Sequence, residues 1–71
     1  MNYFDALKRC RKYRGCTQKQ AASAAGVVLS MYQYYEYGKH EPSVSVLIAL
    51  ADFYDVSLDY LVGRSDDPTR H

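Results

Sequence analysis

Apolar side chains recur every three or four positions near the start of the chain, with lysines and arginines between them. Over residues 3–13 this spacing places one set of side chains on a single helical face: Phe4, Leu7, Cys10 and Arg11. Gly15 then supplies a helix stop, because glycine readily takes the left-handed conformation that ends many helices. The pattern therefore predicts a first helix with one inward face.

Two short periodic segments follow, with only a few residues between them. The first, residues 18–25, is rich in alanine; it begins after Thr17, whose hydroxyl can cap a helix, and ends at Gly26. The second covers about residues 29–35 and closes at Gly38. Because the connection is so short, we expect the two helices to form a tight helix-turn-helix unit.

The second half of the chain predicts two further helices. After a polar loop at residues 39–42, Ser43 can cap a strongly apolar helix that carries Val44, Leu47, Ile48, Leu50 and Ala51. Ser57 can cap a last helix with Leu58, Leu61 and Val62, and Gly63 stands where a left-handed residue commonly ends a helix. No segment alternates with a period of two. We expect an all-α domain of five helices over residues 1–63, with a fraying tail at 64–71.

The composition is that of one small globular domain. With 71 residues, of which 48% are hydrophobic and 24% charged, the chain can form a packed core. The longest apolar stretch, residues 46–51, is far below the ~20 residues that span a bilayer, and the N-terminus lacks the apolar run of a signal peptide. We therefore expect a cytoplasmic protein without a membrane segment.

The residues that carry catalysis or bind metals are sparse. Cys10 and Cys16 are too few for a disulfide framework, and no second pair of cysteines or histidines completes a zinc site. We expect both cysteines to be small buried hydrophobic residues. The only histidines are His40 and His71, and no glycine-rich loop for phosphate is present. The sequence therefore indicates neither an enzyme nor a cofactor.

Charge is divided unevenly along the chain, although the net charge is only +1. Residues 1–20 carry Asp5 and the cations Lys8, Arg9, Arg11, Lys12, Arg14 and Lys19. Residues 41–67 carry Arg64 and the anions Glu41, Asp52, Asp55, Asp59, Asp66 and Asp67. Two explanations stay open: a basic face that meets nucleic acid, and ordinary solvated helix surfaces.

The spacing of small, polar and apolar residues across these helices resembles that of the Cro/CI (XRE-type) helix-turn-helix proteins. The matching positions in the first part are Gly15, Cys16, Thr17, Gln18, Ala22, Gly26, Tyr35, Glu36, Gly38, Pro42, Ser43 and Leu47. Further on they are Leu50, Ala51, Phe53, Val56, Ser57, Leu58, Asp59, Tyr60, Leu61 and Gly63. The resemblance covers about residues 3–63. It implies a five-helix lambda-repressor-like fold and a repressor-like regulator that binds specific double-stranded DNA sequences, with no small-molecule ligand.

The resemblance places the third helix in the major groove of DNA. At 100° per residue, its outward edge consists of two neighbouring strips, with one further residue at the margin. We therefore expect base contacts from Val28, Leu29, Ser30, Gln33 and Tyr34. A glutamine can pair with adenine through two hydrogen bonds, and apolar side chains can meet thymine methyl groups.

Tyr32 and Tyr35 point the other way on the same helix. The family usually has bulky aliphatic residues where Ala21 and Ala25 stand here, so we expect the two tyrosines to fill the core. Each buried hydroxyl then needs a hydrogen-bond partner or a path to solvent.

Other contacts follow from the resemblance alone. Gln18 matches the family's glutamine at the start of the second helix, which contacts a DNA phosphate, and Thr17, Tyr37 and Lys39 are placed to join it. Arg11 and Glu36 match the family's buried ion pair between the first and third helices.

Two questions stay open at the level of sequence. The apolar residues Leu58, Leu61 and Val62 of the last helix can either pair two copies as a homodimer or finish the core of the monomer. In addition, the third helix is unusually rich in tyrosine for a DNA reader. This composition allows an alternative function, a protein-interaction module or antagonist of another regulator that uses the tyrosine-rich face.

Overall fold

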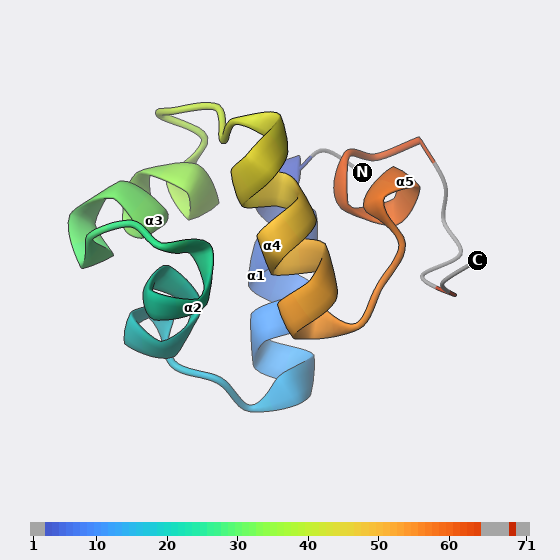
Figure 1. Ribbon diagram of the computed structural model, residues 1–71, viewed down its shortest axis with the longest axis horizontal. Coiled ribbons are helices and arrows are strands. Elements are labelled where there is room, and N and C mark those ends of the chain that lie inside the picture. Colours follow the sequence, from blue (N-terminus) through green and yellow to red (C-terminus); the bar gives the residue numbers. More distant parts are fainter. Residues whose placement is uncertain (1–2, 65–68, 70–71) are drawn as a thin grey trace.

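The computed structural model describes residues 3–64 and 69, and within them the backbone forms helices and no strand (Figure 1). The five helices are α1 (Tyr3–Arg14), α2 (Gln18–Ala25), α3 (Leu29–Tyr37), α4 (Val44–Tyr54) and α5 (Leu58–Leu61). The all-α expectation and the order of the helices are confirmed. α1 and α3 extend slightly beyond the predicted ends at residues 13 and 35.

The helix starts follow the capping residues that the sequence contains. Thr17 Oγ1 accepts a hydrogen bond from the backbone N–H of Gln20 at 3.0 Å, and the Gln20 side chain accepts one from the Thr17 N–H at 2.9 Å. This reciprocal pair satisfies two backbone donors at the start of α2. Ser43 and Ser57 cap α4 and α5 with one bond each.

Residues in the left-handed conformation end the first four helices, beginning with Gly15 (φ 68°) directly after α1. Gly26 (φ 72°) closes α2 and Gly38 (φ 76°) closes α3, as the sequence predicts. α4 ends at Asp55 (φ 56°), a left-handed residue that is not glycine. The sequence pattern did not indicate this helix end. Left-handed turns reverse the chain within a few residues, so consecutive helices can pack against one another.

α1 and α4 form the centre of the molecule, with α2 and α3 on one side and α5 on the other (Figure 1). The core draws on all five helices and on the loop before α5. Its buried members are Leu7, Cys10, Ala21, Ala22, Tyr32, Tyr35, Leu50, Ala51, Tyr54, Val56 and Leu61. The helix-turn-helix unit is therefore fixed to α1 and α4 through shared packing.

Tyr32 and Tyr35 lie inside, as expected, beside the buried Ala21. Tyr32 and Tyr54 are both fully buried, and their hydroxyl oxygens are 2.6 Å apart, which is a hydrogen bond. Tyr35 packs edge-on against Tyr32, with ring centroids 6.5 Å apart. The prediction that these tyrosines fill the core is confirmed, and Tyr54 is the partner that the sequence did not identify.

One expectation about burial is wrong, and one question that the sequence left open is answered in part. Cys16 is half-buried rather than buried, because it lies in the short connection just before the first turn of α2. Leu61 is completely buried in the core and Val62 is partly buried, so only Leu58 of the expected dimer residues is exposed. The last helix therefore finishes the core of the monomer. Most of the predicted fraying tail lies outside the described residues.

Within residues 3–64 and 69, no group of three or more metal-ligating side chains comes together. No helix among the same residues has the length and apolar character needed to cross a membrane.

Candidate nucleic-acid interface

The outward edge of α3 is open to solvent. Val28, at the N-cap, is 69% exposed, Leu29 is 41% exposed and Tyr34 is 40% exposed. Ser30 is also exposed, and Gln33 is half-buried between this edge and α2. The predicted orientation of the helix is confirmed; that these side chains contact bases stays a prediction.

Gln33 is held in place by a side chain of α2. Its Nε2 donates a hydrogen bond to Oε1 of Gln18 at 3.1 Å. Gln18 in turn donates from its own Nε2 to Oε1 of Glu36 at 3.2 Å. Gln18, expected at a phosphate, therefore also bridges the exposed edge of α3 and a buried carboxylate.

Glu36 and Arg11 form the ion pair that the resemblance implied. Arg11 Nε lies 2.7 Å from Oε2 of Glu36, and Arg11 Nη2 donates to Oε1 at 3.3 Å. The Glu36 side chain has no exposed surface, and Arg11 also donates from Nη1 to the backbone oxygen of Cys16. A bidentate geometry of this kind fixes both side chains. It links α1 to α3, and the bond to Cys16 links α1 to the connection before α2.

The buried carboxylate remains ionised. Burial by itself raises the pKa of Glu36, but hydrogen bonds from Arg11, Tyr32 and Gln18 outweigh this effect and lower the pKa below its ordinary value. Tyr32 also bonds to Tyr54, and in this pair either hydroxyl can donate. A chain of hydrogen bonds thus runs from Arg11 and the buried Glu36 through Gln18 to Gln33.

The side chains expected at phosphates lie on α2, α3 and the loop after it. Thr17, Tyr37 and Lys39 are all exposed, although the hydroxyl of Thr17 is already occupied by the cap of α2. Tyr37 occupies the last turn of α3, and the Lys39 backbone N–H bonds to the oxygen of Tyr34 at 2.9 Å. Their contact with phosphate stays a prediction.

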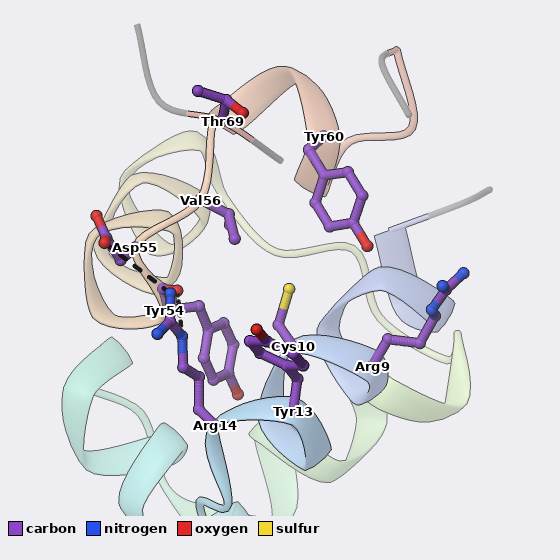
Figure 2. A pocket seen from close by; sticks show the side chains of 9 residues that line it. All are labelled: Arg9, Cys10, Tyr13, Arg14, Tyr54, Asp55, Val56, Tyr60 and Thr69. Carbon is purple, nitrogen blue, oxygen red and sulfur yellow. Dashed lines mark hydrogen bonds and ion pairs between the residues drawn. The ribbon is translucent and has the colours of Figure 1, made fainter. Parts of the chain in front are cut away.

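The arginines of the basic segment at the start of the chain do not share one face. Arg11 is paired with Glu36, while Arg9 and Arg14 line a hollow of about 450 Å³ between α1, the end of α4 and α5 (Figure 2). There Arg14 Nε donates to the backbone oxygen of Tyr54 at 2.9 Å. Because α5 and α3 lie at opposite sides of the molecule (Figure 1), this hollow lies away from the outward edge of α3.

Comparison of the sequence with protein families and with curated proteins points in one direction. Residues 7–61 match the helix-turn-helix family model. The chain is 39% identical over 66 residues to the HTH-type transcriptional regulator YobD of Bacillus subtilis, covering 93% of this chain and 59% of the relative. It is 36% identical over 64 residues to the cryptic phage CTXphi transcriptional repressor RstR of Vibrio cholerae, covering 90% and 57%. The chain thus spans somewhat more than half the length of these relatives.

Solved structures with the same arrangement are also known. A transcriptional regulator from Listeria innocua has 32% sequence identity and a TM-score of 0.82, covering 87% of this chain and 58% of that one. The P22 c2 repressor, solved in complex with a synthetic operator, has a TM-score of 0.84 at 23% identity, covering 92% and 98%. The five helices therefore have the lambda-repressor-like arrangement, with the helix-turn-helix at α2 and α3.

Proposed function

Because this chain belongs to the helix-turn-helix family of Cro/CI (XRE-type) transcriptional regulators, we propose that it is a repressor that binds specific double-stranded DNA sequences. One observation carries the proposal: α3 presents an open edge whose glutamine, Gln33, is oriented by Gln18. A reading side chain held in position before binding loses less conformational freedom when it binds. We assign no catalytic activity and place the protein in the cytoplasm.

In this proposal α3 enters the major groove and its edge reads bases. One N–H of Gln33 is used by Gln18, which leaves the second N–H and the amide oxygen for N7 and N6 of an adenine. Val28 and Leu29 supply apolar surface for thymine methyl groups, and Ser30 and Tyr34 supply hydroxyls for base edges.

Phosphate contacts would fix the position of the helix without reading sequence. Lys39 supplies a positive charge and Tyr37 a hydroxyl at the end of α3, while Thr17 and Gln18 stand at the start of α2. The backbone N–H groups in the first turn of α2 add partial positive charge for an anion.

The test is a selection of bound sequences from random duplex DNA, followed by affinity measurements across salt concentrations. We expect an enriched sequence and an affinity that falls steeply with salt, because phosphate neutralisation releases counterions. Gln33→Ala should abolish the preference for one adenine, at a cost of about 1–3 kcal/mol. The matched control is Tyr13→Ala, since Tyr13 is 84% exposed and lies on the hollow away from α3. Absence of an enriched sequence would reject the proposal.

A second candidate is a protein-interaction module. The observation in its favour is the exposed apolar and aromatic surface on and beside α3, formed by Val28, Leu29, Tyr34 and Tyr37. Tyrosine is enriched in the centres of protein interfaces. In this case no duplex would be enriched in the selection, and Tyr37→Ala would weaken binding to another regulator.

For assembly we propose a homodimer in which Leu58 of α5 meets its counterpart. Leu58 is 37% exposed, and Ile48 on α4, which shares a shallow hollow with it, is 46% exposed. Two copies related by a twofold axis would place their α3 helices in half-sites about 34 Å apart. Sedimentation of wild type and Leu58→Glu tests this: a wild type that stays monomeric at all concentrations would rule the dimer out.

A further inference from the structure

The loop that follows α3 folds back onto the helix it has just left. Gly38 turns the chain with φ 76°, and the backbone N–H of Lys39 then bonds to the oxygen of Tyr34 at 2.9 Å. The next residue, His40, places its imidazole against the Tyr34 ring, with centroids 5.5 Å apart and planes inclined by 39°. This ring pair lies on the open side of α3, where both residues are exposed.

The loop is also fastened from the opposite direction by α1. The hydroxyl of Tyr3 donates to the backbone oxygen of His40 at 2.9 Å, although the two residues are 37 positions apart in the chain. Tyr3 stacks edge-on against Phe4, and the Phe4 ring lies against Gly38. The backbone of His40 is thus tied to α1, which keeps the base of its side chain beside the Tyr34 ring.

From this arrangement we propose that His40 is a positioning residue that holds the Tyr34 ring in one orientation for contact with DNA. The inference rests on the proposed function, in which Tyr34 belongs to the base-contacting edge. A tyrosine that is 40% exposed on a helix can change its side-chain rotamer, and each change removes its hydroxyl from the DNA. The imidazole packed against the ring restricts this motion, so less conformational freedom is lost on binding.

The experiment compares His40→Ala and His40→Phe, each in the wild type and in Tyr34→Ala, using the duplex obtained by selection. His40→Ala should weaken binding about 3- to 10-fold, the range of an aromatic pair. His40→Phe should restore most of the affinity, because it keeps a ring and loses only the imidazole nitrogens. In the Tyr34→Ala background, His40→Ala should have no further effect. The midpoint of thermal unfolding should stay close to that of wild type in every variant at position 40.

The Cβ proton couplings of Tyr34 in solution give a readout that needs no DNA. A single rotamer is expected in wild type and His40→Phe, and averaged couplings in His40→Ala. Averaged couplings already in wild type would overturn the inference even if the protein binds DNA well. Loss of affinity in His40→Phe equal to that in His40→Ala would also overturn it, since His40 would then act through its own polar atoms. If wild type selects no duplex, the proposed function is rejected. A single rotamer of Tyr34 in that case would show that the ring pair exists but has no role in DNA binding.

Discussion

Gln33 on the open edge of α3 donates a side-chain hydrogen bond to Gln18 of α2, with 3.1 Å between Nε2 and Oε1. The bond connects the proposed reading face to the buried Glu36, because Gln18 also donates to that carboxylate. The orientation of this half-buried amide therefore depends on an ion pair in the interior. Helix capping and helix packing position α2 and α3, and these hydrogen bonds orient the side chain of Gln33.

The first prediction concerns Gln18. Gln18→Ala removes the acceptor that orients Gln33, so we expect weaker discrimination of the adenine that Gln33 reads, by about 1–3 kcal/mol. Overall affinity should also fall if a phosphate contact is lost. Competition between the selected duplex and one with that adenine replaced measures the effect, with the exposed neighbour Lys19→Ala as the control. Unchanged discrimination in Gln18→Ala would show that Gln33 does not depend on its partner.

Much of the fold could be predicted because its signals are local. Capping by Thr17 and the left-handed Gly26 depend on a few adjacent residues, and the helix they bound was predicted at residues 18–25, as observed. Helical geometry was enough to predict which face of α3 points into the core, and Tyr32 on that face is buried. The Arg11–Glu36 pair was implied by the resemblance rather than by any local pattern.

What could not be predicted depends on contacts between distant parts of the chain. Tyr54 is 22 positions from Tyr32, and nothing in the helical pattern of α4 indicates which hydroxyl it meets. Gln18 was expected at a phosphate, but its bonds to two residues of α3 follow from how the helices cross. Whether Leu61 faces a second copy or the monomer core depends on how α5 packs, and only the structure answers this.

The second prediction concerns the buried ion pair. Arg11→Met removes the partner of an interior carboxylate, so we expect the free energy of unfolding to fall by about 3–5 kcal/mol. The cost comes mainly from leaving the ionised Glu36 without compensation. Urea unfolding of Arg11→Met against Lys12→Met, an exposed cation on the same helix, measures it. A similar loss in both variants would mean that the ion pair contributes no more to the free energy of unfolding than an exposed cation does.

The third prediction is a dependence of stability on pH. Because the folded protein lowers the pKa of Glu36 below the unfolded value, Glu36 contributes stability fully above that unfolded value, which is about 4.3. The contribution is lost as the pH falls through the lower, folded pKa, since the unfolded chain then binds more protons. The unfolding free energy of Glu36→Gln should therefore depend less on pH below about 4.3 than that of wild type. Parallel curves for the two proteins would contradict the lowered pKa.

The fourth prediction separates the two buried hydroxyls. Tyr32→Phe removes the hydrogen bond to Tyr54 and also the Tyr32 hydroxyl, which helps to lower the pKa of Glu36, so we expect a loss of about 2–3 kcal/mol. Tyr54→Phe removes only a bond between two neutral groups and should cost about 1 kcal/mol. The double variant should be about as stable as Tyr32→Phe alone, because the two changes act on one chain of bonds. Equal costs for the single variants would show that the Tyr32 hydroxyl does not stabilise the Glu36 carboxylate.

The last prediction compares two glycines with nearly the same backbone. Gly26 and Gly38 both have a left-handed φ, 72° and 76°, so alanine at either position carries a strain of about 1–2 kcal/mol. A Cβ at Gly26 meets nothing within 4 Å, whereas one at Gly38 comes within 3.1 Å of the Phe4 ring. Gly38→Ala must therefore also displace Phe4 on α1, and we expect it to lower the free energy of unfolding by about 1 kcal/mol more than Gly26→Ala does.

The additional cost at Gly38 should disappear when the obstructing ring is removed. In a Phe4→Leu background the smaller side chain leaves room for the methyl group, so Gly38→Ala and Gly26→Ala should become equally destabilising. Chemical denaturation of the four variants measures both differences. If Gly38→Ala stays more costly in the Phe4→Leu background, the obstruction is not the ring, and the contact between α1 and the loop after α3 is looser than its distances indicate.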